Sequence, residues 1–583
     1  MSSSVTNFPD IPKPFLKLFP ESLNKVQQQS YHDIWNTDNN IIVQAPTGSG
    51  KTVIAQLAIL KALLKPGKAL YLGPLRALNH EKFAELRKFD SLNWKTRLVL
   101  GGSSPSDLSD CDILLSTPEK FLSLLHSLNF SSFPLSVIVI DEIHLLAEGK
   151  RGAYLEYLLM FLRTHYPSIR LIGLSATIPN TFQLAEWLQA TPLIYDNSYR
   201  STQLQTKLID LPESMQEKFG RMVKAYQISK KFLPNQSLIF TTSRANVHFY
   251  AKMFTSWAQR DELPFHSKVN FQNQKLSELS YYGIAFYHAG LSESDKKKII
   301  EEFLNNNIKI LISTSSLAWG VNLPAKVVII ADLDYNNPLT GKETMSSSDI
   351  LQMLGRAGRP QHHDKGYGYV VVSKDQKEKI EGFIEGSAPV RSSLRDYFPE
   401  LLLLYLSHIP QETILFDDLA EFFEQSFLVS SKYTTLTDIN DSLEEAIRIL
   451  FLAKLIIYEN FKINITSLGL ATSKFFIHPD TASNLISHQP DITNLMNFLP
   501  FISEFNNIVV RNSEKKFLRQ LGASIKTYQV YKLQYIISTA EKGNKLNQEF
   551  IGDGKVIYQE YKRIKSYYEY ISNIFIDNYP NNN

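Results

Sequence analysis

The decisive stretch of this sequence is Ala45-Pro46-Thr47-Gly48-Ser49-Gly50-Lys51-Thr52. It follows the short β-branched run Asn40–Gln44 and precedes the apolar helical pattern Val53–Leu64. A glycine-rich turn between a buried strand and a helix is the context that a phosphate-binding loop requires, because the first N–H groups of the helix face the anion. The strict pattern of such loops begins with Gly, where this chain has Ala45. The stretch predicts a nucleotide-binding α/β domain.

The residue types in this loop suit ATP and Mg²⁺. Glycines allow backbone N–H groups to approach phosphate oxygens, and Lys51 is placed to reach the β- and γ-phosphates. The Thr52 hydroxyl is placed to ligate Mg²⁺. The nucleotide contacts predicted from this loop are Thr47, Gly48, Ser49, Gly50, Lys51 and Thr52.

Up to about residue 390 the chain alternates short β-branched runs with longer helical patterns, which indicates two α/β domains with parallel sheets. The predicted strands of the first domain are Asn40–Gln44, Ala69–Leu72, Ile113–Ser116, Val137–Ile140 and Leu171–Leu174. Those of the second domain are Ser237–Thr241, Ile284–Tyr287, Ile308–Ser313, Val327–Ala331 and Gly368–Val372. We expect the boundary between the domains near Tyr195–Ser201.

A pair of acidic residues follows one of these strands directly, in Asp141-Glu142-Ile143-His144. At the end of a strand beside a phosphate-binding loop, Asp141 can hold Mg²⁺ and Glu142 can orient or deprotonate the attacking water. The alternative is an acidic turn that caps the next helix, which the upstream loop makes the weaker interpretation.

With these two motifs the sequence begins to resemble the superfamily-two helicases, and further stretches match that family in order. The matching stretches are Pro74-Leu75-Arg76-Ala77-Leu78 (motif Ia), Thr117-Pro118-Glu119-Lys120 (motif Ib), Ser175-Ala176-Thr177 (motif III), Phe240 to Arg244 (motif IV), Thr314 to Pro324 (motif V) and Gln352 to Pro360 (motif VI). The resemblance implies that Gln27 reads adenine and that Gly320 lies at the nucleotide. It also implies that the nucleic-acid backbone is held by Arg76, Thr117, Pro118 and Thr314.

Motif VI has a direct physical rationale as well. Arg356 and Arg359 are three residues apart in a predicted helix, so both guanidinium groups can project from one face. Across a cleft from Lys51 they would neutralise charge on the transferred phosphoryl group, whereas the alternative is two surface arginines in a glycine-rich turn. The predicted catalytic residues are Lys51, Glu142, Gln352, Arg356 and Arg359.

Motifs V and VI are very similar to those of the Ski-like group of these helicases, which includes archaeal DNA-repair helicases and the meiotic, spliceosomal and signal-cointegrator helicases. Farther on, Thr466-Ser467-Leu468-Gly469 looks like the end of that group's winged helix, and Val510-Arg511-Asn512-Ser513-Glu514 looks like the start of its Sec-type, or ratchet, helical domain. The implied domains are two RecA-like domains (residues 1–198 and 199–390), a winged-helix domain (391–485) and a helical ratchet-like domain (486–583).

The composition changes along the C-terminal third. Residues 396–460 carry 12 acidic and 3 basic side chains, whereas residues 511–577 carry 12 basic and 7 acidic ones. In the basic segment, apolar residues recur at helical spacing from Ile557 to Phe575, and the basic side chains lie largely off that stripe. Lys555, Lys562 and Arg563 are predicted to line a nucleic-acid channel; a solvated basic face is the open alternative.

A projecting hairpin is predicted between motifs V and VI. The β-branched run that begins at Val327 leads into turn-forming residues around Pro338 and Gly341, and then into a second short segment. In the resembling group this position carries the wedge that separates duplex strands, so Tyr335 and Leu339 are expected near the junction; an ordinary surface loop is the alternative.

Composition limits the remaining possibilities. The chain has 583 residues and a formal net charge of +3, so a nucleic-acid site must be a local patch and not a global field. The single cysteine, Cys111, excludes a disulfide framework and a cysteine-based zinc site. The start lacks a secretory pattern, and no apolar run approaches the roughly 20 residues of a membrane span. We expect a soluble intracellular protein with no membrane partner, in the nucleus or an archaeal cytoplasm.

The expected function is that of an ATP- and Mg²⁺-dependent helicase that translocates 3′ to 5′ on single strands. A monomer acting on single-stranded or branched nucleic acid, DNA in preference to RNA, in repair or replication-fork processing is the first hypothesis. The alternatives are a helicase that remodels RNA or ribonucleoproteins, including ribosome rescue, and an ATP-gated clamp or scaffold that does not unwind. The sequence identifies no protein partner.

Overall fold

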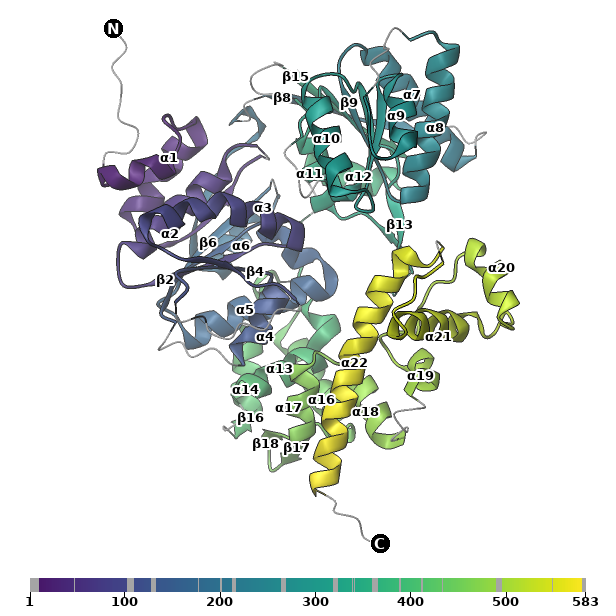
Figure 1. The fold of residues 1–583 in the computed structure, drawn as a ribbon. Coiled ribbons are helices and arrows are strands. Elements are labelled where there is room, and N and C mark those ends of the chain that lie inside the picture. Colours follow the sequence, from purple (N-terminus) through teal and green to yellow (C-terminus); the bar gives the residue numbers. More distant parts are fainter. Residues whose placement is uncertain are drawn as a thin grey trace.

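A computed structural model describes residues 10–46, 48–101, 108, 110–126, 133–176, 178–199, 202–211, 216–263, 269–317, 323–337, 339, 341–358, 365–386, 389–409, 413–432, 434–488, 495–547 and 549–578. Two parallel sheets with helices on both faces form two lobes; the residues from 394 to 488 lie below the first lobe, and most of the residues from 495 onward lie below the second lobe (Figure 1). We call the described parts of residues 10–199 the first lobe and those of residues 202–386 the second lobe.

The first lobe contains a seven-stranded parallel sheet in the order β3-β4-β2-β5-β6-β1-β7. Its strands are β1 (Asn40–Gln44), β2 (Lys68–Leu72), β3 (Thr96–Leu98), β4 (Ile113–Ser116), β5 (Leu135–Ile140), β6 (Arg170–Ser175) and β7 (Ala190–Ile194). Its α-helices are α1 (Lys25–Asn36), α2 (Lys51–Leu63), α3 (Arg76–Leu86), α4 (Pro118–Leu125), α5 (Gly149–His165) and α6 (Thr181–Trp187). Short 3₁₀ helices are η1 (Lys13–Leu18), η2 (Arg87–Leu92), η3 (Ile143–Ala147) and η4 (Asn197–Tyr199).

The second lobe contains a six-stranded parallel sheet in the order β10-β11-β9-β12-β15-β8. Its strands are β8 (Gln203–Asp210), β9 (Ser237–Thr241), β10 (Ile284–Tyr287), β11 (Ile310–Thr314), β12 (Val327–Ile330) and β15 (Lys365–Val372). Its helices are α7 (Glu217–Phe232), α8 (Arg244–Arg260), α9 (Gln274–Ser280), α10 (Glu293–Leu304), η5 (Ser315–Leu317), α11 (Ser347–Gly355) and α12 (Lys377–Glu385). The prediction of two RecA-like parallel-sheet domains is confirmed.

Three strands of the two parallel sheets were absent from the sequence prediction, and all three lie at a sheet edge. They are β3, β7 and β8. β8 alternates exposed and half-buried residues and is largely polar, and β3 has three residues, so neither shows the continuous apolar run of a central parallel strand.

The predicted hairpin is present. β13 (Asp334–Asn337) pairs antiparallel with β14 (Gly341–Thr344), outside the second sheet. Figure 1 shows it pointing from the second lobe toward the upper end of the C-terminal helix.

Beyond the second lobe, residues 394–488 combine helices with a small antiparallel sheet in the order β16-β18-β17. We call this part the mixed region. Its strands are β16 (Ile414–Leu415), β17 (Ile456–Glu459) and β18 (Lys462–Ile465). Its helices are η6 (Leu394–Tyr397), α13 (Phe398–His408), α14 (Phe416–Glu424), α15 (Phe427–Ser430), α16 (Leu436–Leu452), α17 (Ser467–Lys474) and α18 (Pro479–His488).

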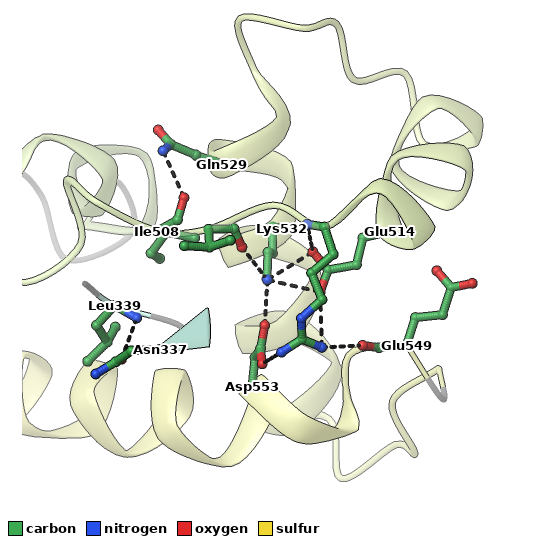
Figure 2. A network of polar contacts seen from close by, with 10 residues as sticks. Asn337, Leu339, Ile508, Glu514, Gln529, Lys532, Glu549 and Asp553 are labelled. Carbon is green, nitrogen blue, oxygen red and sulfur yellow. Dashed lines mark hydrogen bonds and ion pairs between the residues drawn. The ribbon is translucent and has the colours of Figure 1, made fainter. Parts of the chain in front are cut away.

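The described residues from 495 to 578 form the helical region. Its helices are α19 (Leu495–Phe498), η7 (Leu499–Phe501), α20 (Asn512–Gln520), α21 (Tyr528–Glu541) and α22 (Ile551–Asn578). A fully buried lysine, Lys532 of α21, joins them: its ammonium contacts both oxygens of Glu514 at 2.9 Å and the Asp553 carboxylate at 2.6 Å (Figure 2). Arg511 also binds Asp553, so each buried charge is paired.

The apolar core is divided unequally between these parts. One cluster covers a single face of the first sheet, with α1 and α2. The cluster on the opposite face continues through α5 and α13 into the mixed and helical regions as far as Ile571. The second lobe has a cluster of its own, to which the first lobe contributes Leu78 among the described residues. Among the described helices, none combines the length and hydropathy of a membrane span.

Candidate functional site

The phosphate-binding loop has the backbone that its sequence predicts. Gly48 and Gly50 have φ angles of +82° and +85°, in the left-handed region that favours glycine. α2 begins at Lys51, directly after the loop. The Lys51 ammonium donates to the carbonyl of Ala45 at 2.8 Å, and the buried Ser49 hydroxyl has no hydrogen-bond partner within the described structure. Thr47 lies outside the described residues.

Residues at the start of α1 donate hydrogen bonds to the backbone of this loop. Gln27 donates through Nε2 to the carbonyl of Gly50 at 3.1 Å, and Asn24 donates through Nδ2 to the carbonyl of Ser49 at 2.8 Å. Asn24 and Gln27 also form a reciprocal capping box. Gln27 is therefore placed against the loop, while its predicted contact with adenine stays a prediction. Asn24 was not predicted, although an Asn three residues before Gln at a helix start is a readable capping signal.

The acidic pair lies at the end of β5, facing α2. Asp141 accepts a hydrogen bond from the Tyr71 hydroxyl at 2.6 Å, and its other oxygen accepts from the Glu142 N–H at 3.1 Å. Burial, followed by the Glu142 charge, raises the pKa of Asp141, and the Lys82 charge opposes the shift. Glu142 has a left-handed φ of 53°, and its Oε2 atom is buried without a hydrogen bond to the described residues. The imidazole of His144 is 3.6 Å from that oxygen.

A cleft of about 430 Å³ joins the two lobes at this point. The first lobe lines it with Gly48, Gly50, Lys51, Thr52, Leu78, Glu81, Lys82, Glu85, Asp141 and Glu142. The second lobe lines it with Thr202, Pro324, Gln352, Gly355, Arg356 and Gly358. The structure therefore brings together the loop, the acidic pair and the start of motif VI, which are about 300 residues apart in the chain.

Motif VI departs from the predicted helix. α11 ends at Gly355, so Arg356 is the first residue after it, and Arg359 lies outside the described residues. Gly358, with φ +92°, donates to the carbonyl of Ala325 at 2.7 Å, and Ala325 donates to the carbonyl of Arg356 at 3.0 Å. The predicted helix therefore does not continue through Arg356, because the chain leaves it to form this bridge, and the placement of both arginines on one face stays a prediction. Burial lowers the pKa of Arg356, and the charge of Glu81 across the cleft opposes this.

The donor set of the cleft fits Mg-ATP. The Thr52 hydroxyl and the Asp141 carboxylate are oxygen ligands of the kind Mg²⁺ prefers, and Lys51 with the N–H groups of the loop suits phosphate. The unpartnered Glu142 Oε2 is available to a water at the γ-phosphate. Bound Mg²⁺ would supply charge neutralisation at the phosphates. Gly320 lies outside the described residues, so its predicted place at the nucleotide stays a prediction.

One face of α3 was missed by the sequence analysis. Leu78, Glu81, Lys82 and Glu85 recur at helical spacing of three and four residues and all line the cleft. The spacing was readable, but nothing in the sequence alone says which face of the helix meets the nucleotide.

The candidate nucleic-acid contacts follow the carboxyl ends of strands in both lobes. Arg76, after β2, is exposed and begins α3. Thr117, after β4, accepts a hydrogen bond from the Lys120 N–H at 3.3 Å and caps α4, and Pro118 occupies the first turn of that helix. Thr314 ends β11 of the second lobe. In open α/β sheets, ligands bind at these ends of the strands, so the placement agrees with the predicted role without testing it.

The two hairpin residues occupy different environments. Tyr335 pairs with Glu343 across the strands, and its hydroxyl donates to that carboxylate at 2.6 Å. Leu339, at the turn, packs against the core cluster that continues into the helical region, and Figure 2 shows it together with the network around Lys532. The tip of the hairpin therefore contacts the helical region, while Tyr335 packs on the core of the second lobe.

The three basic residues of α22 also differ from one another. Lys555 and Lys562 are exposed, and the Lys562 ammonium lies 4.7 Å from the ring centroid of Tyr558. Arg563 instead donates to the carbonyl of Phe475 at 3.1 Å and to that of Phe476, and it pairs with Glu560. The expectation of one solvent-facing basic set therefore needs correction at Arg563, whose guanidinium joins α22 to the end of α17.

Two family models match the chain in the region of the cleft. A model described as DEAD/DEAH box helicase matches residues 24–185, and a model described as helicase conserved C-terminal domain matches residues 218–361. The chain belongs to the superfamily 2 DExH-box helicases, in the Ski-like group, a class of ATP-hydrolysing enzymes.

Three relatives are similar to this chain over much of its length. It is 30% identical over 578 residues to the "Activating signal cointegrator 1 complex subunit 3-like" protein of Dictyostelium discoideum, covering 87% of this chain and 25% of the relative. It is 30% identical over 556 residues to the "ATP-dependent DNA helicase MER3" of Saccharomyces cerevisiae, covering 86% of this chain and 45% of the relative. It is 33% identical over 401 residues to the human activating signal cointegrator 1 complex subunit 3, covering 64% of this chain and 18% of the relative. The chain thus spans less than half the length of each.

Proposed function

We propose that this chain is an ATP-dependent helicase that translocates 3′ to 5′ along single strands and unwinds DNA. The observation that carries the proposal is the cleft between the lobes, where Lys51, Glu142 and Arg356 meet. Candidate backbone contacts stand at the strand ends of both lobes, so opening and closing of the cleft would shift one set of contacts relative to the other.

Residues 391–485 are proposed to form a winged-helix domain and residues 486–583 a ratchet-like domain. The first proposal is supported by the helices of the mixed region beside the sheet β16-β18-β17. The second is supported by the 28-residue α22, which lies alongside the mixed region and reaches toward the hairpin (Figure 1). Together with the lobes they would enclose the exported strand, which exposed cations and aromatic rings can hold without reading its sequence.

We propose DNA and not RNA as the substrate, because the MER3 relative, which is named as a DNA helicase, matches along 86% of this chain. A role in repair or replication-fork processing follows from that preference. The scaffold alternative is disfavoured, because a protein that only binds has no need to keep Lys51, Asp141, Glu142 and Arg356 together in one cleft.

Unwinding of matched DNA and RNA duplexes with 3′ or 5′ overhangs tests the proposal. We expect the fastest unwinding on DNA with a 3′ overhang, and none by the Glu142→Gln variant. Preferred unwinding of RNA would move the protein to the RNA-remodelling alternative. ATP hydrolysis without unwinding of any of the four duplexes would favour a clamp.

A further inference from the structure

A cation from α3 contacts the hydroxyl that is predicted to ligate Mg²⁺. The Lys82 ammonium donates to Thr52 Oγ1 at 2.9 Å. Both oxygens of Glu85 hold the same ammonium at 3.1 Å, one helical turn away. The Lys82 side chain is 12% exposed, so this contact lies inside the cleft and not on its rim.

The charge of Lys82 also acts on the other predicted metal ligand. Lys82 and Asp141 line the same cleft, so the ammonium places a positive charge near the carboxylate. Lys82 thus contacts Thr52 and brings positive charge to the site of Asp141, which are the two tasks expected of a divalent cation there.

The ammonium and Mg²⁺ cannot both approach Thr52 closely. Mg²⁺ binds oxygen at about 2.0–2.1 Å, so two cations on one hydroxyl oxygen would be within a few ångströms of each other. In a partly buried site this repulsion is weakly screened.

We propose that Lys82 is a positioning residue that competes with Mg²⁺ for the Thr52 hydroxyl. When the metal enters with a nucleotide, the ammonium leaves Thr52 and stays with Glu85. Because Lys82 and Glu85 lie on the same helix, their ion pair can persist without movement of the backbone. Lys82 thereby keeps the charge of the acidic pair balanced without metal and sets the Mg²⁺ concentration at which the site loads. This inference rests on the proposed nucleotide site and adds a regulator to it.

The test measures binding of a fluorescent ADP analogue to the full chain over a series of free Mg²⁺ concentrations, with EDTA as the metal-free limit. In Lys82→Met, which keeps the length of the side chain and removes its charge, the half-saturating Mg²⁺ concentration is expected to fall about tenfold, as for the removal of one charge-assisted hydrogen bond. Lys95→Met is the matched control, because Lys95 is an exposed lysine paired with Asp110 at 3.0 Å and does not line the cleft. It should leave that concentration unchanged.

Glu85→Gln provides an independent second variant. It removes the carboxylate that balances Lys82, so the ammonium is left to the acidic pair and the half-saturating Mg²⁺ concentration should rise. An unchanged Mg²⁺ dependence in both variants would overturn the competition. A parental protein that binds no ADP at any Mg²⁺ concentration would overturn the nucleotide site itself, which is a different failure.

Discussion

Lys51 and Glu142 have separable roles at the residue scale. Lys51 can neutralise phosphate charge in bound ATP, whereas Glu142 has a buried Oε2 atom, without a hydrogen bond to the described residues, that can accept from a water. Lys51→Ala should lose both nucleotide affinity and hydrolysis. Glu142→Gln should keep ATP binding and lose hydrolysis, because Asp141 is left for Mg²⁺. Steady-state ATPase and equilibrium binding of an ATP analogue check this, and undiminished hydrolysis by Glu142→Gln would remove Glu142 from the site.

Glu156 of α5 is a buried carboxyl outside the cleft. Its Oε1 atom accepts from the Leu428 N–H at 3.1 Å, while Oε2 has no hydrogen-bond partner within the described structure. Burial raises the pKa of Glu156 to about 7. This effect outweighs the hydrogen bonds from Ser392, Leu428 and Phe427, which lower the pKa. The folded protein therefore holds a proton there that an unfolded glutamate, with a pKa of about 4.3, releases.

The contribution of Glu156 to the free energy of unfolding is therefore fully present below about pH 4.3, and it is lost as the pH rises toward 7. Glu156→Gln, which carries no titratable proton, should gain stability relative to the parent as the pH is raised from 5 to 8, by up to about 3 kcal/mol. Urea unfolding at both pH values measures the difference. A constant difference between the two proteins would contradict the raised pKa.

The site residues that could be predicted are those that follow one another in a motif. Loop glycines, Lys51 and the acidic pair each sit at the end of a strand, so their neighbours along the chain define their environment. Lys82 and Asn24 could not be predicted in this way, because their partners Thr52 and Ser49 lie 30 and 25 residues away and are reached only through the fold. Arg356 was predicted, but the backbone that carries it was not.

At the scale of elements, the hairpin β13–β14 contacts the helical region near its turn. Leu339 packs on the shared core, and a Cβ added at Gly341 would lie 3.9 Å from Val509. Replacing Tyr335–Thr344 by a short Gly-Ser turn should leave nucleic-acid-stimulated ATPase largely intact while unwinding is lost. Opening one base step costs about 1–2 kcal/mol of stacking, which an apolar tip can offset. Unwinding at the parental rate would place the wedge elsewhere.

α22 carries cations with two different tasks. Arg563→Ala should lower the free energy of unfolding by about 2 kcal/mol, because it leaves the carbonyls of Phe475 and Phe476 without their donor. Reversing the exposed pair, Lys555→Glu with Lys562→Glu, should leave stability nearly unchanged and weaken single-strand binding. The salt dependence of binding should become shallower by about one unit for each phosphate that the protein no longer neutralises. Unchanged binding and slope would return both lysines to a solvated face.

At the scale of the whole molecule, the number of separate cores is smaller than the number of predicted domains. The sequence predicts four units, but the first lobe, the mixed region and the helical region share one continuous core, and the second lobe has its own. The merger depends on α5 packing against η6 and α13, which no pattern within either segment reveals. The second lobe therefore has a core separate from that of the rest, which it contacts at the cleft, at the hairpin tip and at a second pocket between His144 of the first lobe and Leu351 of the second.

Two half-buried histidines lie against the aromatic residues of the merged core and titrate in the sense opposite to Glu156. His126, after α4, and His408, at the end of α13, have ring centroids 4.5 Å apart, and the Tyr157 hydroxyl is 2.9 Å from His408 Nδ1. Burial lowers the pKa of His126 to about 4 and that of His408 to about 3. The Lys474 charge adds to the effect at His126, and the neighbouring His126 ring adds to it at His408. Both rings are neutral in the folded protein.

Because an unfolded histidine has a pKa of about 6.5, these rings contribute stability that is present above that pH and lost as the pH falls toward 4. From pH 7.5 to 5, each should cost the folded state about 2 kcal/mol, whereas Glu156 gains stability over the same range. Because the two rings together lose more stability than Glu156 gains, the joint between the first lobe and the mixed region should be less stable at pH 5 than at pH 7.5. His408→Gln keeps a polar partner for Tyr157 and removes the titration, so it should lose less stability than the parent between pH 7.5 and 5 in urea unfolding. The double variant with Glu156→Gln also lacks the opposing contribution of Glu156, so it should lose about 2 kcal/mol through His126 over this range, more than the His408→Gln variant loses. Equal acid sensitivity of all four proteins would show that other groups govern this joint.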